Sequence, residues 1–210
     1  MKKLIIFSIC LICVVVKPVH CQFSDFALKV AEISEYIASP GFSEYYKSIN
    51  HVDLVDTIYI KALTICDYEQ DLTLGALIFA LLPVNSATVK IPLLPVRIKI
   101  PFFSASEPVF SLKNENLPRY LFSDSPTGKN GDIDKLAHFF GSAYLEYSSF
   151  LLNSARFLGH FIEAFEDFFK VDSYISYRDL KVNELGIKFG RELKCNKNAL
   201  PSVYLNYYRQ

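Results

Sequence analysis

The sequence lacks the compact motifs by which many enzymes are identified. It contains no His-Glu-x-x-His of zinc proteases, no Gly-x-Ser-x-Gly nucleophile elbow and no Gly-x4-Gly-Lys-Ser/Thr phosphate loop. The segment 126–131, Pro-Thr-Gly-Lys-Asn-Gly, has some of the residues of the last motif without its spacing, and we interpret it as a turn. Catalysis by a serine or cysteine nucleophile is therefore weakly supported.

Cysteine is scarce in the part of the chain that is expected to fold. Three of the five cysteines (Cys10, Cys13 and Cys21) lie within the first 21 residues, which leaves Cys66 and Cys195. Neither has the spacing of a metal motif. In an oxidising compartment the two could form a disulfide, or they could remain two separate buried thiols, and the sequence leaves both alternatives open.

Tryptophan is absent and glycine is rare, yet the chain is rich in other apolar residues. It contains 8 Gly, 18 Phe and 13 Tyr, and 51% of its residues are hydrophobic. This composition excludes an intrinsically disordered protein. Residues 22–210, which follow the N-terminal leader described in the next paragraph, have a length that suits one domain.

The first 21 residues resemble a secretory signal peptide. Two lysines precede an apolar run over residues 4–16, which is too short for a membrane-spanning helix of about 20 residues. We expect cleavage before Gln22 and export to the periplasm or the extracellular space. An uncleaved N-terminal anchor is the alternative, and Cys21 raises lipidation as a further one, although His20 fits a lipoprotein signal poorly.

The net charge argues against two classes of main partner. Removal of residues 1–21 leaves 19 Lys and Arg against 22 Asp and Glu, a small negative excess. We therefore expect neither nucleic acid nor an anionic membrane surface as the main partner. A component of the cell envelope remains compatible with the composition.

Residue patterns predict an α+β fold with a mixed N-terminal half, residues 22–131. Helical spacing covers 23–50, with a break at 39–41 and a short second helix over 43–49. Residues 57–65 are β-branched and aromatic, and residues 89–100 alternate between apolar and polar, so we expect a small antiparallel sheet of two to four strands. The apolar run 72–84 fits either a strand or a buried helix. Residues 104–131 are expected to be irregular.

Residues 132–210 are predicted to form a helical module of three to four helices. Helical periodicity covers residues 132–151, 154–170 and 177–193, and Pro201 is suited to the first turn of a short terminal helix. Gly186 and Gly190 lie one turn apart in the third segment and lower its helix propensity. A close crossing with another helix would explain both glycines.

Each of these three helices carries two polar residues four positions apart. A four-residue spacing places both side chains on one helix face, so the pairs could converge in a single polar cluster. Taken separately, the residues have simpler explanations: a helix N-cap, a buried histidine with a hydrogen-bond partner, and a solvated face. The pairs are Asp134 with His138, Glu163 with Asp167, and Asp179 with Asn183.

The same positions define a resemblance to bacterial envelope proteins. The pattern Asp-Lys-x-x-His-Phe from Asp134, Gly-x3-Glu-x3-Asp from Gly159 and Ser-x2-Asp-x3-Asn-x2-Gly-x3-Gly from Ser176 resembles a family of predicted periplasmic lipoproteins whose function is unknown. It is more loosely similar to VanZ-like membrane proteins, from which this chain differs in lacking long apolar spans. The resemblance implies an exported helical envelope module with the six polar residues as its characteristic positions, and it implies no reaction.

Two hypotheses for the function follow. In the first, the protein is non-catalytic and needs no cofactor, and its buried polar cluster serves structure or ligand recognition. In the second, the cluster binds a divalent metal such as Zn²⁺ or Mn²⁺, as a binding module or a metal-dependent hydrolase. The ligands in the second hypothesis are one imidazole and three carboxylates, from His138, Glu163, Asp167 and Asp179.

Overall fold

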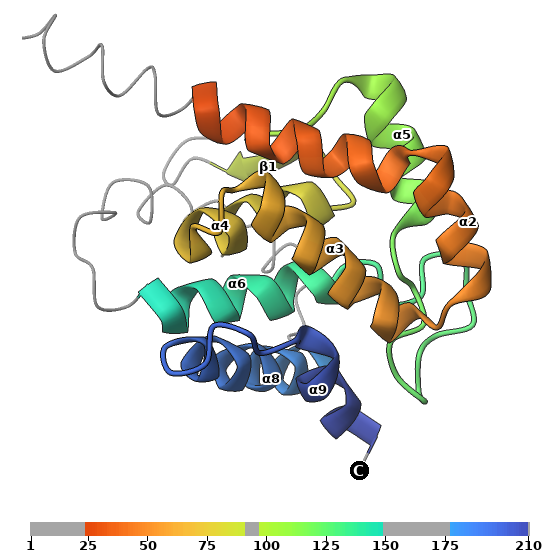
Figure 1. The fold of residues 1–210 in the computed structure, drawn as a ribbon. Coiled ribbons are helices and arrows are strands. Elements are labelled where there is room, and N and C mark those ends of the chain that lie inside the picture. Colours follow the sequence, from red (N-terminus) through yellow and green to blue (C-terminus); the bar gives the residue numbers. More distant parts are fainter. Residues whose placement is uncertain (1–23, 91–96, 149–176, 210) are drawn as a thin grey trace, which may run out of the picture.

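The computed structural model describes residues 24–90, 97–148 and 177–209, and these form a mostly helical protein with a small two-stranded antiparallel sheet (Figure 1). This result is consistent with the predicted α+β class. After a helix over residues 24–38, the elements are α2 Pro40–Ser48, α3 His51–Ile65, α4 Gln70–Leu81, β1 Ser86–Lys90, β2 Arg97–Pro101, α5 Glu107–Asn116, α6 Lys135–Ser148, α8 Tyr177–Leu193, α9 Pro201–Leu205 and the 3-10 helix η2 Asn206–Arg209.

The centre of the described core is α4, which is buried at every position from Thr73 to Leu81. An apolar helix with no polar face belongs inside a protein, and α4 packs between α3 and α6. The second interpretation of the apolar run, a buried helix, is therefore confirmed. The core continues from the N-terminal helices to α9 and includes Leu205, so both halves of the described chain share it.

The prediction of a strand over residues 57–65 is wrong, because these residues belong to α3. Asn50 begins that helix: its side-chain oxygen accepts hydrogen bonds from the backbone N–H groups of Val52 and Asp53, both at 3.0 Å. The buried side chains then recur at helical spacing. Burial of that face outweighs the β-branched composition on which the strand prediction depended. The buried side chains of α3 include Val55, Ile58, Tyr59 and Ala62.

The N-terminal helix pair is confirmed, with an earlier start for its second member. The first helix ends at residue 38, and α2 begins at Pro40 instead of residue 43. Ser39 caps α2 by accepting a hydrogen bond from the backbone N–H of Phe42 at 3.3 Å. Proline is well suited to the first turn of a helix because its missing N–H would have no partner there.

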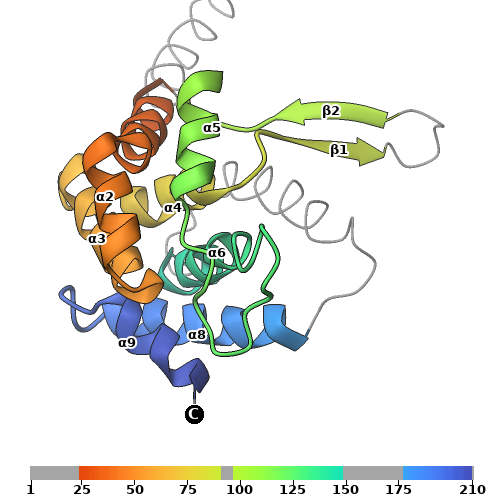
Figure 2. The same ribbon diagram turned by 90° about the vertical axis from the view of Figure 1, so that its right-hand side faces the viewer.

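The alternating segment forms a β-hairpin that extends away from the helices (Figure 2). Within the described chain, β1 and β2 pair antiparallel, from Ser86 opposite Pro101 to Lys90 opposite Arg97. The prediction of a small antiparallel sheet is confirmed at its lower bound of two strands. Pro92 and Pro95 lie outside the described residues.

The prediction that residues 104–131 are irregular is wrong in part, because α5 occupies Glu107–Asn116. Pro108 lies in the first turn of α5, so this proline starts a helix and does not interrupt one. The Lys113 side chain is 1% exposed, and its ammonium donates to the Leu82 carbonyl at 2.6 Å. Burial lowers the pKa of Lys113 to about 7.

The C-terminal predictions are confirmed where the structure describes them. The first predicted helix contains α6, the third coincides with α8, and Pro201 begins α9. The second predicted helix, 154–170, lies outside the described residues. None of the described helices is long and apolar enough to cross a membrane. Cys66 is buried and Cys195 exposed, and both are free thiols, so the disulfide alternative is not realised.

Candidate functional site

The site begins with the close crossing of α6 and α8. A Cβ atom on Gly186 would lie 2.2 Å from the Phe139 carbonyl oxygen, and one on Gly190 would lie 2.3 Å from that of Ala143. Both contacts are far shorter than atoms allow, and both are with backbone of α6. Glycine is therefore required at these positions, and the expected close crossing is confirmed.

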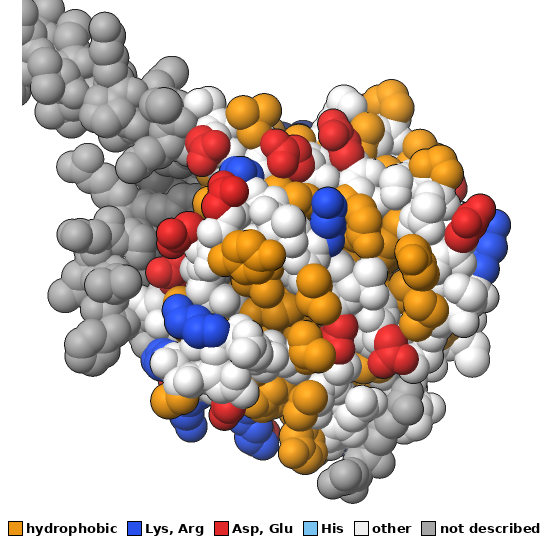
Figure 3. Space-filling model, viewed as in Figure 1, with side chains coloured by type: hydrophobic (Ala, Val, Ile, Leu, Met, Phe, Trp, Pro, Cys, Tyr) orange, Lys and Arg blue, Asp and Glu red, His pale blue; other side chains and the backbone are white. Residues whose placement is uncertain are grey.

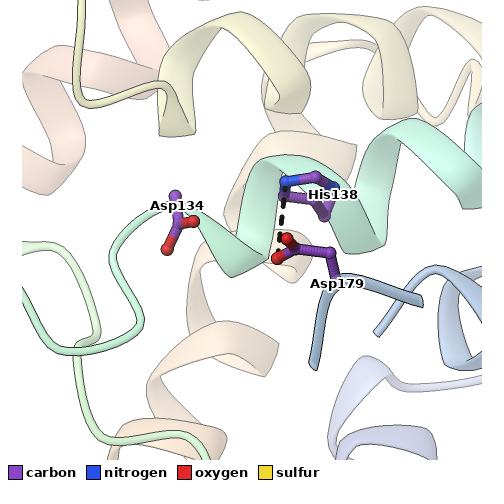
Figure 4. A group of neighbouring side chains, drawn as sticks. All are labelled: Asp134, His138 and Asp179. Atoms are coloured by element: carbon purple, nitrogen blue, oxygen red, sulfur yellow. Dashed lines mark ion pairs between the residues drawn. The ribbon is translucent and has the colours of Figure 1, made fainter. Parts of the chain in front are cut away.

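This crossing brings polar side chains of α6 and α8 together (Figure 4). The Nε2 atom of His138 lies 3.8 Å from an Asp179 carboxylate oxygen. On the other side of the imidazole ring, Nδ1 lies 3.2 Å from the Asn183 side-chain oxygen. Asp134, just before α6, contributes a further carboxylate. We call Asp134, Lys135, His138, Asp179 and Asn183 the α6–α8 cluster.

Lys135 joins the two carboxylates of the cluster. Its ammonium lies 2.5 Å from an Asp134 carboxylate oxygen and 2.7 Å from one of Asp179. Its side chain is 10% exposed, and burial alone would lower the pKa of Lys135. The hydrogen bonds and the charges of both carboxylates outweigh burial, so the pKa is raised and Lys135 is charged at neutral pH.

His138 is the titratable member of the cluster that is neutral at neutral pH. Burial lowers the pKa of His138 to about 4, although the nearby Asp179 carboxylate opposes this shift. The Asn183 side-chain oxygen faces Nδ1, so the tautomer with its proton on Nδ1 can donate a hydrogen bond to Asn183.

The structure describes four of the six polar residues predicted from the sequence. Asp134, His138, Asp179 and Asn183 do meet, whereas Glu163 and Asp167 lie outside the described residues. One ligand atom from each of Asp134, His138 and Asp179 lies within 4.8 Å of the others, a separation that suits a shared metal ion. Asp134 was not among the predicted metal ligands.

A second buried ion pair was not predicted. Asp132 is fully buried, and its carboxylate accepts a hydrogen bond from the Arg178 guanidinium at 2.6 Å and from the Leu121 backbone N–H at 3.2 Å. Arg178 also donates to the hydroxyl of Tyr208 at 3.3 Å. The pair fastens the start of α8 to the loop before α6. Sequence spacing does not reveal this pair, because Arg178 lies 46 residues beyond Asp132 in the chain.

The neutral state of His138 predicts a loss of stability in acid. The pKa is lowered from 6.5 to about 4 on folding, so the unfolded chain takes up the proton first as the pH falls. His138 therefore stabilises the native state fully above pH 6.5, and this contribution of about 3 kcal/mol is lost between pH 6.5 and 4. Urea unfolding across that range should show a smaller loss for His138→Gln. An unchanged pH dependence in this variant would contradict the assignment.

A matched variant separates this effect from that of His51, a half-buried histidine elsewhere in the described structure. The Nδ1 atom of His51 accepts a hydrogen bond from the backbone N–H of Arg119 at 2.9 Å. Burial and the Arg119 charge lower the pKa of His51, so it adds a loss in the same direction as the pH falls. His51→Gln should remove only its own share, and His138→Gln should remove the larger share.

No protein-family model, curated protein or solved structure matches the chain, so comparison with known proteins assigns it to no family. The interpretation of the α6–α8 cluster therefore depends on its geometry and charge.

Proposed function

We propose that the protein is an exported, non-catalytic component of the bacterial cell envelope, in which the α6–α8 cluster fixes the arrangement of two helices. The observation that supports this proposal best is the position of Lys135, whose ammonium contacts the carboxylates of both Asp134 and Asp179. The chain itself thus supplies the cation that these two carboxylates require. Each carboxylate therefore has a charged partner within the chain, although one ammonium does not neutralise both carboxylates.

The charge states of the cluster also favour a structural role over acid–base catalysis. An efficient general base has a pKa near the pH at which the enzyme works. The pKa of His138, about 4, is far from neutral, and its side chain is only 7% exposed. Its observed partner is Asn183, which orients the ring between α6 and α8.

Export is supported by the leader and by the resemblance described above. The predicted leader has a basic start and a short apolar run, and the pattern of polar positions resembles predicted periplasmic lipoproteins. Expression in a bacterial host should yield a periplasmic product whose N-terminal residue is Gln22. A product that retains residues 1–21 in the cytoplasm would contradict export.

A divalent metal site is the second candidate function. The compact grouping of Asp134, His138 and Asp179 supports it, because two carboxylates and a neutral imidazole suit Zn²⁺ or Mn²⁺. A metal ion at this position would have to displace the Lys135 ammonium from at least one carboxylate. That displacement is the reason for ranking a structural cluster first.

Thermal unfolding with and without metal distinguishes the two candidates. For a structural cluster, the melting temperature should be the same in EDTA, Zn²⁺ and Mn²⁺, and His138→Ala should lower it under all three conditions. A rise in melting temperature with added metal that Asp179→Asn abolishes would establish the metal site instead. Glu184→Gln, which removes an exposed carboxylate of α8, is the control for nonspecific metal binding.

A further inference from the structure

The β-hairpin is the one described element pair that stands apart from the helical body. We call β1 and β2 together the β-arm. The two strands contact each other extensively, whereas neither makes comparable contacts with any described helix. Figure 2 shows the arm extending to one side, away from α2 and α3. Its surface is therefore not needed to complete the described helical core.

The arm has a basic face and an apolar face. In its antiparallel register Thr88 is opposite Lys99, and Ala87 is opposite Ile100. Residues that lie opposite each other on paired strands share a face, and so do alternate residues along one strand. Arg97 and Lys99 therefore lie on the same face as Thr88. These three residues are exposed. On the other face Ala87 is buried and Ile100 is 40% exposed.

The positive charge of the arm is not balanced within the described structure. Neither Arg97 nor Lys99 forms an ion pair with another described residue, whereas Lys188 pairs with Glu184 on α8. The sequence contains no acidic residue between Asp71 and Glu107. Glu107, at the base of the arm, accepts a hydrogen bond from Asn85 at 2.8 Å. By contrast, acidic and basic side chains are interspersed on the face shown in Figure 3.

We infer that the basic face of the β-arm binds the surface of an anionic lipid bilayer. Exposed basic side chains are attracted to anionic headgroups, and Arg97 and Lys99 lie on one face of the arm, both exposed. The expected export of the chain favours lipid over nucleic acid as the anionic partner. The net charge of the chain without residues 1–21 is negative, which argues against a membrane surface. That total combines the positive charge of the arm with the more acidic composition of the rest of the chain.

Vesicle co-sedimentation of the purified protein tests this inference. The protein should bind vesicles of phosphatidylcholine mixed with phosphatidylglycerol, and binding should weaken as salt is added. Pure phosphatidylcholine vesicles should bind little. The double variant Arg97→Gln/Lys99→Gln should lower the partition coefficient roughly 30-fold, since each basic side chain near an anionic surface contributes about a factor of 5.

The matched control removes the same charge elsewhere. Lys47→Gln/Lys129→Gln changes two exposed lysines outside the arm and should leave binding within about two-fold of the unmodified protein. Equal binding by the arm variant, equal binding to pure phosphatidylcholine, or no binding to anionic vesicles would overturn the inference. So would tighter binding to duplex DNA at the same salt, or self-association that the arm variant abolishes. Circular dichroism checks that both double variants remain folded.

Discussion

Lys135→Met is expected to lower the free energy of unfolding by about 3–5 kcal/mol. The ammonium of Lys135 is the charge that contacts both Asp134 and Asp179, and the side chains of Lys135 and Asp179 are 10% and 15% exposed. Removing it leaves two carboxylates close together, one of them in a shielded position. An uncompensated charge that is shielded from water costs far more than the net value of the intact pair. Urea unfolding at neutral pH measures the change.

Lys188→Met is the matched control for this prediction. Lys188 also pairs with a carboxylate, that of Glu184 at 2.8 Å, but both side chains are more than half exposed. An exposed pair of this kind contributes little to stability, because water screens both charges. If Lys135→Met destabilised no more than Lys188→Met, the cluster would not fasten α6 to α8.

Gly186→Ala/Gly190→Ala is expected to destabilise the protein by about 4 kcal/mol, because each added methyl group meets backbone of α6. The closest contacts would be 2.2 Å to the Phe139 carbonyl oxygen and 2.3 Å to that of Ala143. Backbone cannot rotate away as a flexible side chain can, so the two helices must separate. Alanine recovers up to about 1 kcal/mol per site in helix propensity, which the overlap exceeds. Chemical denaturation gives the net change.

The control for the glycine variant has the opposite expected sign. Gly41 lies in α2, and a Cβ at this position would meet no atom within 4 Å. Gly41→Ala should therefore leave stability unchanged or raise it by up to about 1 kcal/mol. A double variant at Gly186 and Gly190 that was as stable as the unmodified protein would show that α6 and α8 do not cross closely.

The C-terminal helices were predictable because their faces differ in chemistry. In α8 the charged positions, including Lys188, lie on a different face from Gly186 and Gly190, so the residue pattern is that of a helix with one buried side. The polar residues on that side, Asp179 and Asn183, needed partners, and Lys135 and His138 on a neighbouring helix could supply them. Residue spacing thus predicted that Asp134, His138, Asp179 and Asn183 could converge, as an alternative to separate local roles, and it did not place Lys135 among the site residues.

The wrong or missed structural predictions occurred where contacts between residues distant in sequence outweigh the local conformational preference of the chain. In α3, burial of one helix face outweighs the preference of the β-branched residues for strands. Asn50 caps the start of this helix, and the residue composition does not reveal that cap. In α5, Pro108 marks a first turn instead of a break. The Asp132–Arg178 pair depends on a loop that returns to α8, and no local pattern encodes that return.

The interaction between Lys135 and Asp179 tests the central claim most directly, and a double-mutant cycle measures it. Lys135→Met, Asp179→Asn and the combined variant are unfolded in urea at neutral pH, and the coupling free energy is taken from the three changes. A structural cluster predicts that the combined variant is more stable than the sum of the single changes implies, by about 2–3 kcal/mol. A coupling near zero would contradict the proposal that this ion pair holds α6 against α8.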